Sequence, residues 1–368
     1  MRLIAPVLAV VALAASNPGS APRIDFWNVQ RRGANLFDQV ERQERLAAAH
    51  AAGMSFVRLA PNKWLNGRPD RERGDFLLGP RDAFTGIPPR DLARLRDVLD
   101  QADAAGLKVV LTMLSLPGGR WRQHNGGVEE RRIWTSFEAQ RQAIAFWTRL
   151  ARALKGHPAV AGLNIRNEPS PERVPPGLAD WYTGDYAAWY ARAKDTPADL
   201  NLFYRKVVAG IREVDPDVPI ILDSGFYATP WAFTVLEPVA DDKVLYSFHM
   251  YEPYAYTSPK NTGALRYPGP IPTGETDDAP TVDWDRDEVE RFLAPVAEWQ
   301  RRYDVPATRI LAGEFGVVRT HPGAEAYLGD VLSVLNAHGW HWAFYGFRED
   351  GWAAMDYELG TGRPPAVT

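Results

Sequence analysis

Eight short apolar segments recur along this chain, and helical patterns lie between most of them. The segments occupy residues 33–37, 55–60, 108–114, 160–166, 218–223, 243–249, 309–314 and 340–347. Some are continuous apolar runs, such as 109–111 and 219–222, and continuous runs are typical of strands that are buried on both faces of a parallel sheet. The spacing therefore predicts eight buried strands rather than one long helix or an alternating, half-exposed sheet.

The helical patterns occupy residues 39–52, 89–105, 137–155, 201–214, 285–303 and 323–338, and a glycine directly follows several of them. Glycine is the usual residue just after a helix, because it adopts the left-handed conformation without strain. Strand and helix in repeated alternation predict an α/β protein, specifically a (β/α)8 TIM barrel. A doubly wound open sheet is the alternative, but no G-x-G-x-x-G motif follows the first strand, which argues against a dinucleotide-binding fold.

Two connections are longer than the others, at residues 170–200 and 252–283, after the fourth and sixth strands. In a barrel both emerge on the C-terminal face, where the active sites of this fold lie. No composition shift marks a second domain, so residues 22–368 are expected to form one catalytic barrel domain.

The first residues resemble an export signal. Arg2 precedes an apolar run at 3–15, and Ala12-Leu13-Ala14 has the small-x-small form of a cleavage site. The run is too short to span a bilayer. We expect a signal peptide at 1–21, cleaved between about residues 14 and 21, and a secreted or periplasmic protein; a buried N-terminal helix is the alternative.

The charge and composition exclude several classes of function. A net charge of −4 provides no basic surface for nucleic acid. The chain has no cysteine, which excludes disulfides and thiolate chemistry. The seven histidines are dispersed without an H-E-x-x-H motif, and no G-x-S-x-G motif is present. We therefore expect no metal, no cofactor, and no nucleic-acid or membrane partner after signal removal.

Polar residues stand at the ends of the predicted strands. In a barrel these ends converge on one mouth, and polar groups are costly in a packed interior, so their convergence predicts an active site. Two carboxylates in such a site can cleave glycosidic bonds, because one protonates the leaving oxygen while the other attacks or activates water. The strand-end residues are Arg58, Leu114, Asn167, Glu168, His249, Tyr251, Glu314 and Tyr345.

Several segments resemble glycoside hydrolase family 5, the large cellulase and mannanase family of clan A. Residues 155–169, which end in Asn167-Glu168-Pro169, resemble its fourth strand, and Ala312-Gly313-Glu314-Phe315-Gly316 resembles its seventh. Phe248-His249-Met250-Tyr251, Phe56-Val57-Arg58-Leu59 and the segment at 351–360 match other family motifs in the expected order. The resemblance covers residues 33 to 360 and implies the barrel fold and a β-glycoside hydrolase.

The resemblance also implies roles for individual residues. Glu168 would be the general acid/base and Glu314 the nucleophile of a retaining reaction, with their carboxyl groups at the shorter of the two separations that glycosidases use. Asn167 would bind the 2-hydroxyl of the sugar in the −1 subsite. Arg58 and Tyr251 would contact Glu314, and His249 would lie near Glu168.

Two positions depart from the family pattern, because Leu114 stands where a histidine is usual and Tyr345 where a tryptophan is usual, with Trp342 nearby. Both departures affect the −1 subsite and leave the sugar open. Aromatic side chains could stack on sugar rings or pack within loops; the candidates are Trp64, Trp121, Trp181, Trp231, Tyr254 and Trp352, and the aromatic segment 181–190 is expected to line the cleft.

The expected function is hydrolysis of a β-glucan, cellulose-like or β-mannan-like glycan with retention. The expected partner is an oligo- or polysaccharide substrate, and we expect a monomer. A transglycosylase using the same site and a non-catalytic glycan-binding barrel are the alternatives.

Overall fold

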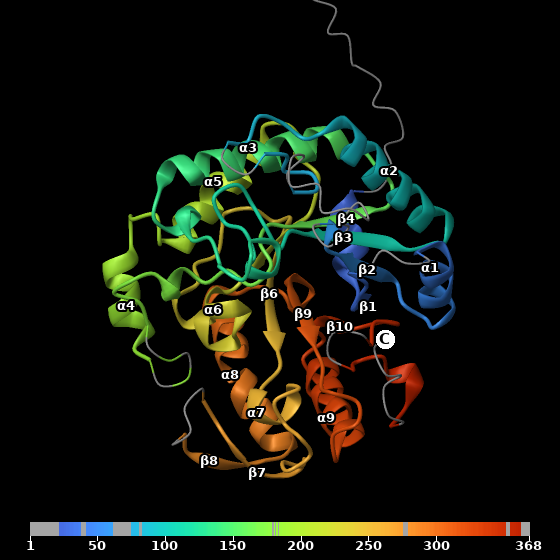
Figure 1. Ribbon diagram of the computed structural model, residues 1–368, viewed down its shortest axis with the longest axis vertical. Coiled ribbons are helices and arrows are strands. Elements are labelled where there is room, and N and C mark those ends of the chain that lie inside the picture. The colour runs from blue at the N-terminus through green and yellow to red at the C-terminus, as the bar shows by residue number, and fades with distance from the viewer. Residues whose placement is uncertain are drawn as a thin grey trace, which may run out of the picture.

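The computed structural model describes residues 22–37, 42–61, 75–80, 83–178, 180, 182, 184–274, 279–350 and 354–361. Its centre is a closed barrel of parallel strands in the order β1, β10, β9, β6, β5, β4, β3 and β2 (Figure 1). The strands are β1 (Arg32–Asn35), β2 (Phe56–Leu59), β3 (Lys108–Thr112), β4 (Val160–Asn164), β5 (Ile220–Asp223), β6 (Val244–Met250), β9 (Ile310–Phe315) and β10 (His341–Phe344). Each of the eight predicted segments overlaps one strand, so the (β/α)8 prediction is confirmed.

An outer layer of helices covers the barrel. In Figure 1 α2, α3 and α5 lie along its upper side, and α8 and α9 along its lower side. The long helices are α1 (Arg42–Ala51), α2 (Pro89–Ala104), α3 (Phe137–Leu154), α5 (Leu200–Arg212), α8 (Arg286–Tyr303) and α9 (Ala324–Ala337). Between β5 and β6 two short elements, α6 (Gly225–Ala228) and η6 (Pro230–Val235), take the place of a long helix.

Helix α3 shows how the sequence sets these helices. It begins at Ser136, whose side chain accepts a hydrogen bond from the Ala139 N–H, which satisfies one of the free donors of the first turn. One face is buried, and Trp147 on that face donates its Nε1–H to the Ile165 carbonyl at 3.0 Å. This contact fixes the helix against the strand that leads into the predicted Asn167-Glu168 motif.

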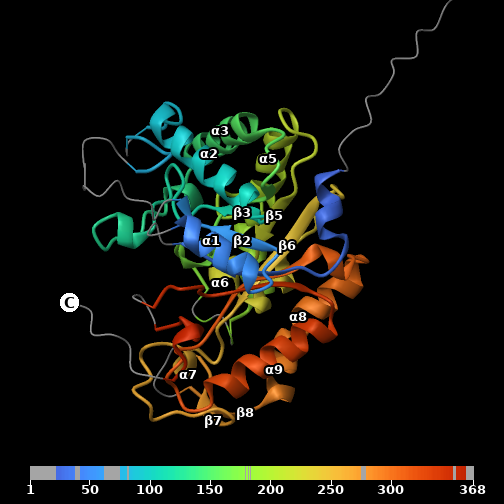
Figure 2. The same cartoon turned by 90° about the vertical axis from the view of Figure 1, so that its right-hand side faces the viewer.

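Apolar side chains fill the N-terminal end of the barrel interior. The short helix η1 (Arg23–Asn28), blue at the right of Figure 2, covers this end, and the Trp27 indole donates to the Ala161 carbonyl at 2.8 Å. The inward residues of this layer are Phe56, Val110, Ala161, Ile221, Leu245, Leu311 and Ala343. Because the described residues pack this end shut, a ligand would enter the barrel from the C-terminal end of its strands.

The two long connections contain secondary structure that the sequence patterns did not predict. The first contains η5 (Pro171–Arg173) and α4 (Tyr186–Ala193), and the second contains α7 (Tyr254–Thr257) and an antiparallel pair, β7 (Gly269–Pro272) and β8 (Thr281–Trp284). The remaining short turns are η3 (Arg122–His124), η4 (Arg132–Trp134), η7 (Ala307–Arg309) and η8 (Tyr357–Leu359). Within the ranges given above, no helix is long and apolar enough to cross a membrane. The predicted signal peptide at 1–21 lies outside the described residues.

Candidate active site

The site is built above a buried polar layer whose centre is Arg58 of β2. The Arg58 side chain is fully buried. Its Nε and Nη2 donate to Asn164 Oδ1 at 3.0 and 2.7 Å, and its Nη1 donates to Asn35 Oδ1 at 3.0 Å. Its Nη1 also donates to Glu314 Oε1 at 2.6 Å, and its Nη2 donates to Asn167 Oδ1 at 2.7 Å. One guanidinium therefore fixes the side chains of three different strands and of the Asn167 turn, using the rigid, multiply donating geometry of arginine.

Glu314 reaches the mouth of the barrel because β9 contains one extra residue. Leu311 faces the barrel interior and Ala312 faces the helices. Strict alternation would turn Gly313 inward and Glu314 outward. However, β6 pairs Phe248 with Ala312 and His249 with Glu314, which leaves Gly313 without a partner in the ladder. This β-bulge turns the Glu314 side chain inward, a common use of bulges beside active sites.

Glycine suits the bulge position because the interior is crowded there. A Cβ on Gly313 would lie 2.6 Å from Ser247 Oγ and 3.3 Å from His249 Nε2. The Gly313 carbonyl accepts a hydrogen bond from Asn35 Nδ2 at 2.9 Å, so the bulge is also held from β1. The Glu314 orientation thus depends on a small residue before it and on a polar partner across the barrel.

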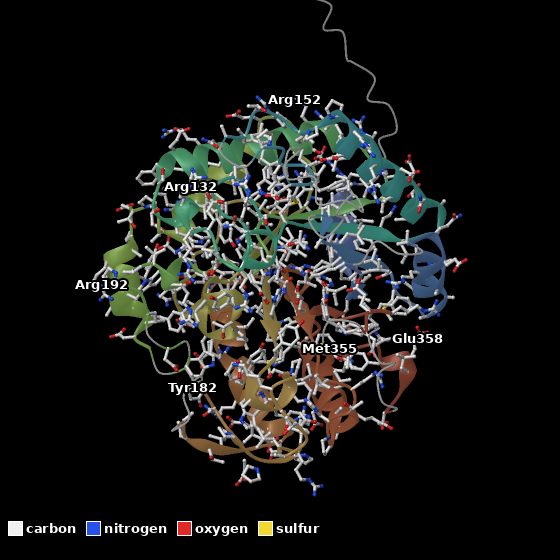
Figure 3. The ribbon with its side chains drawn as sticks, in the orientation of Figure 1. Arg132, Arg152, Tyr182, Arg192, Met355 and Glu358 are labelled. Atoms are coloured by element: carbon white, nitrogen blue, oxygen red, sulfur yellow. The ribbon has the colours of Figure 1, made fainter. Side chains whose placement is uncertain are left out.

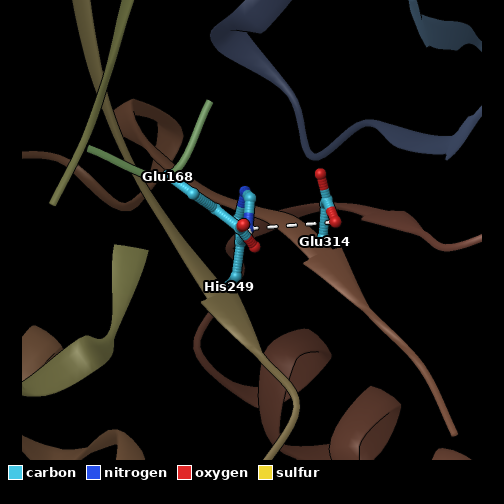
Figure 4. Close-up of side chains that lie close together, drawn as sticks. All are labelled: Glu168, His249 and Glu314. Carbon is cyan, nitrogen blue, oxygen red and sulfur yellow. Dashed lines mark hydrogen bonds and ion pairs between the residues drawn. The ribbon is translucent and has the colours of Figure 1, made fainter. Parts of the chain in front are cut away.

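Glu168 lies opposite Glu314, with His249 between them (Figure 4). His249 Nδ1 is 3.0 Å from Glu168 Oε1 and 3.9 Å from Glu314 Oε2. A carboxylate oxygen of Glu168 and one of Glu314 lie within 4.8 Å of each other. Tyr251, just after β6, donates its hydroxyl to Glu314 Oε2 at 2.8 Å. The contacts that were expected of Arg58, Tyr251 and His249 are therefore present.

The two carboxyl groups have different environments, which separate their pKa values. Burial raises the pKa of Glu168, and the nearby Glu314 charge acts in the same direction against the opposing contact with His249. Burial would also raise the pKa of Glu314, but the charges of His249 and Arg58 and the hydrogen bonds from Tyr251 and Arg58 outweigh it, so this pKa is lowered. One carboxyl is thus favoured as the acid and the other as the anion, the division that a pair of catalytic carboxylates needs.

The same three side chains are also a possible donor set for a metal ion, because one ligand atom each of Glu168, His249 and Glu314 lie within 4.8 Å of one another. Carboxylates and imidazole are common ligands of divalent cations. Here the Arg58 guanidinium already contacts Glu314 at 2.6 Å, and its positive charge opposes a second cation at that carboxylate. The geometry therefore favours acid–base chemistry at this site.

This arrangement can be compared with known proteins. The sequence matches the family model described as Cellulase (glycosyl hydrolase family 5) over residues 25–351, which is most of the chain. The chain belongs to glycosyl hydrolase family 5. The resemblance drawn from the sequence motifs is therefore confirmed.

Curated relatives of this family 5 protein are distant. A β-xylosidase of Phanerodontia chrysosporium is 23% identical over an alignment of 284 residues that covers 73% of this chain and 51% of that protein. A protein of Aspergillus fumigatus described as "Probable glucan 1,3-beta-glucosidase A" is 25% identical over 180 residues, 48% of this chain and 35% of that protein. The chain thus spans about half or less of the length of the curated relatives it matches.

Solved structures share the fold of this family 5 protein. An endoglucanase from the hyperthermophile Thermotoga maritima superposes with a TM-score of 0.62 at 18% identity, covering 89% of this chain and 93% of that one. The cellulose synthase subunit Z of Clostridioides difficile gives a TM-score of 0.60 at 17% identity, covering 90% and 98%. At these identities the likeness concerns the fold.

The two departures from the family pattern lie together on one side of the mouth. Leu114 and Tyr345 belong to a buried cluster with Phe37, Ala60 and Met355, and Trp121, Tyr251 and Tyr357 pack against it. Met355 is labelled near the middle of the face shown in Figure 3. Trp342 lies elsewhere, since its indole donates to Asn336 Oδ1 of α9 at 3.2 Å on the outer side of the barrel. An apolar wall, with Tyr345 in it, therefore borders the carboxylates where the family usually has histidine and tryptophan.

The aromatic residues that were predicted to stack on sugar rings lie in different environments. Trp64, Trp181 and Trp352 lie outside the described residues. Trp231 is half-buried between Tyr182 and Phe292 of α8, with ring centroids 5.2 and 6.2 Å away, so it packs on the outer layer. Tyr182 is labelled away from the middle of the view in Figure 3. Tyr254 is 45% exposed on α7.

The prediction that the 181–190 segment lines the cleft is wrong for Trp189. This residue of α4 is only 5% exposed and belongs to the main hydrophobic core. The reason is that residues 186–190 belong to the helix α4 rather than to an open loop, and Tyr186 and Trp189 on its buried face pack on the protein. Trp121, half-buried beside Leu114 and Tyr345, is the better placed aromatic.

Sequence reasoning missed four polar residues of the buried layer. They are Asn35 of β1, Thr112 of β3, Asn164 of β4 and Asp223 of β5, all fully buried. Each lies at an inward position of its strand, in line with Arg58. Asp223 is the last residue of the predicted segment 218–223 and was overlooked there. The other three lie inside their segments, where a search for polar residues at alternate positions would have found them.

Proposed function

We propose that this protein hydrolyses β-linked glycans by double displacement, with Glu314 as the nucleophile and Glu168 as the general acid/base. The observation that carries the proposal is the distance of at most 4.8 Å between an oxygen of each carboxylate. Retaining glycosidases have carboxyl groups about 5–5.5 Å apart, whereas inverting enzymes need about 6.5–9.5 Å to admit a water molecule.

In the first step a Glu314 oxygen attacks the anomeric carbon while Glu168 donates its proton to the departing glycosidic oxygen. The bond to the leaving group breaks as the glycosyl ester on Glu314 forms. The lowered pKa of Glu314 keeps this group ionised, and the raised pKa of Glu168 keeps a proton available. Arg58 donates to Oε1 of Glu314 and Tyr251 donates to Oε2, and the two contacts hold the attacking carboxylate in place.

In the second step Glu168, now a carboxylate, accepts a proton from water. The water oxygen attacks the anomeric carbon from the face that the leaving group vacated, and Glu314 departs as a carboxylate. Two inversions give a product with the β configuration of the substrate. Asn167, held by Arg58 at 2.7 Å, is positioned to contact the sugar hydroxyl next to the reacting carbon.

The substrate we propose is a β-glucan, cellulose-like or β-mannan-like polymer. The relatives and structural neighbours that support this class carry the names β-xylosidase, glucan 1,3-beta-glucosidase and endoglucanase. A panel of β-glucan, mannan, xylan and aryl β-glycosides, with product analysis, tests it. Proton NMR of the first-formed sugar should show the β anomer; an α anomer would rule out double displacement.

We further propose that the protein is exported and that its signal peptide is removed by cleavage between about residues 14 and 21. The apolar run at 3–15 and the small-x-small segment at 12–14 support this. Intact-mass analysis of protein from the culture medium or periplasm should show loss of the first 14–21 residues. Recovery of the full 368-residue chain from the cytosol would contradict export.

A further inference from the structure

Asp223 is a buried carboxylate beneath the active site that the reaction above does not use. It is the last residue of β5, and its side chain is fully buried. Its Oδ1 accepts a hydrogen bond from Asn164 Nδ2 at 2.9 Å. A buried charge is costly unless it is paired, so the partners of its other oxygen indicate what this group does.

The Oδ2 atom of Asp223 is linked to Glu168 directly and through His249. It accepts a hydrogen bond from the backbone N–H of Glu168 at 3.4 Å, and it lies 3.6 Å from His249 Nε2. The other ring nitrogen of His249, Nδ1, is the atom that contacts Glu168 Oε1 at 3.0 Å. One carboxylate oxygen therefore reaches both the main chain of Glu168 and, through the imidazole, its side chain.

The two contacts of Asp223 Oδ2 are with a strained backbone, at Glu168, and with a buried ring nitrogen, at His249. Glu168 has a φ of 51°, in the left-handed region that non-glycine residues rarely adopt, and its N–H points to Asp223. His249 Nε2 is buried and makes no hydrogen bond within the described part of the chain. Asp223 is the anion at this nitrogen, slightly beyond hydrogen-bond distance.

We propose that Asp223 is a positioning residue for Glu168: it holds the backbone of the acid/base and keeps a proton on His249 Nε2. This rests on the proposed function. With both ring nitrogens protonated, Nδ1–H donates to Glu168 Oε1. The proton of the Glu168 carboxyl then resides on Oε2, free to pass to the leaving oxygen. The third group in such a chain orients the imidazole without itself taking a proton.

Asp223 could instead act on the nucleophile through Arg58, and the two routes predict different activity losses when Asp223 is replaced. Arg58 Nη2 is also 3.6 Å from Asp223 Oδ2, and Arg58 contacts the nucleophile. If Asp223 acted through Arg58 and Glu314, its removal would slow every substrate to a similar extent, because every substrate needs the nucleophile. If Asp223 acts through Glu168, the loss of kcat/KM should grow as the leaving group becomes poorer, because only poor leaving groups need protonation by the acid.

The test compares wild type with Asp223→Asn on aryl β-glycosides of the glycone that wild type cleaves, from dinitrophenyl to unsubstituted phenyl. The asparagine keeps an oxygen for Asn164 but cannot hold the same charge at His249. We expect kcat/KM to fall at least ten-fold more for the phenyl glycoside than for the dinitrophenyl glycoside, within the roughly 10²–10⁴-fold contribution of a general acid. Equal losses on both substrates would overturn the proposal.

The matched control is Asp215→Asn. Asp215 is a buried aspartate that pairs with Arg23 at 2.5 Å before β5, at the closed end of the barrel. The Asp215→Asn variant should have a lower melting temperature, but its kcat/KM should depend on the leaving group as in wild type. If wild type cleaves none of the glycosides, the proposed function fails and the proposal about Asp223 fails with it; if wild type cleaves them and Asp223→Asn loses activity uniformly, only the latter fails.

Two further experiments apply if Asp223→Asn does not fold. Asp223→Ser, which leaves room for water, carries the same comparison of leaving groups. A crystal structure of the wild-type protein should place Asp223 Oδ2 within hydrogen-bond distance of His249 Nε2, at about 3.2 Å or less. A clearly longer separation, with Nε2 bonded to another group, would overturn the proposal.

Discussion

Gly313 is the unpaired residue of β9 that turns Glu314 toward Glu168. Because side chains alternate along a strand, an uninterrupted ladder would direct Glu314 to the outer helices. The bulge adds one residue opposite β6, and the alternation restarts with Glu314 facing inward. The position of one carboxylate in the pair therefore depends on a local irregularity of the strand.

Gly313→Ala should impair catalysis more than folding. The added Cβ would lie 2.6 Å from Ser247 Oγ and 3.3 Å from His249 Nε2, so Ser247 or β9 must move and His249 is crowded. We expect kcat/KM to fall at least ten-fold, since sub-ångström displacement of catalytic groups is costly. Ser247→Gly in the same chain removes the closest clash and should restore part of the activity.

Gly162→Ala is the control for this prediction. Its Cβ would lie 2.8 Å from Ile221 Cδ1 in the lower part of the barrel. It should reduce the melting temperature while leaving the activity of the folded protein close to that of wild type. Equal activity losses in the two variants would show that Gly313 is no more than a packing position.

Substitution of the two glutamates should separate their roles. Glu314→Ala should lose turnover of every substrate, because no group remains to form the glycosyl ester. Glu168→Ala should still form the ester from a dinitrophenyl glycoside, whose leaving group needs no proton, and azide should accelerate the second step to give a β-glycosyl azide. Stopped assays and NMR of the azide product measure this. A β-glycosyl azide from Glu314→Ala would contradict the assignment.

Tyr251→Phe should shift the acidic limb of the pH profile upward. The Tyr251 hydroxyl donates to Glu314 Oε2 at 2.8 Å, and this bond lowers the pKa of Glu314 by favouring its charged form. Loss of the bond raises that pKa, so the nucleophile is protonated, and activity is lost, at a higher pH than in wild type. Hydrogen bonds to charged groups contribute about 1.5–3 kcal/mol, which corresponds to a shift of roughly one pH unit or more.

The measurement is kcat/KM against pH on a dinitrophenyl glycoside, which does not depend on the Glu168 proton. Tyr246→Phe is the matched control: this residue is on the same strand, but its hydroxyl contacts Val239 on the outer side of the barrel. Its profile should match that of wild type. An unchanged acidic limb in Tyr251→Phe would mean that Tyr251 does not act on the ionisation of Glu314.

Two tryptophans should respond in opposite ways to replacement by alanine. Trp231→Ala should lower the free energy of unfolding by about 3 kcal/mol, because the ring packed between Tyr182 and Phe292 is lost. Trp121→Ala should lower kcat/KM on a polysaccharide by roughly five-fold, because Trp121 packs against the cluster that contains Leu114 at the mouth and ring stacking is worth about 1 kcal/mol. Denaturant unfolding and glycan assays distinguish them, and the reverse pattern would exchange their roles.

The sequence was sufficient for the barrel and for the residues at its mouth. Short apolar segments identified all eight strands, and several of them are continuous, because strands buried on both faces need apolar side chains on both faces. Arg58, His249 and Glu314 could be found at strand ends, because polar residues are rare in such runs and the barrel topology brings their ends together. The aromatic residues were harder to place, because stacking on a sugar and packing in a core use the same side chains.

The pattern of the amino-acid sequence is enough to predict which strand ends meet at the barrel mouth, whereas the orientation of their side chains is set by how the strands pair. Periodicity places a side chain on one face of a strand, but the bulge at Gly313 changes that face, and it exists only in the pairing of β9 with β6. In the same way Asp223 acquires its partners from β4 and β6, far from it in the chain. Distances, shared protons and burial arise between segments, and a one-dimensional pattern cannot contain them.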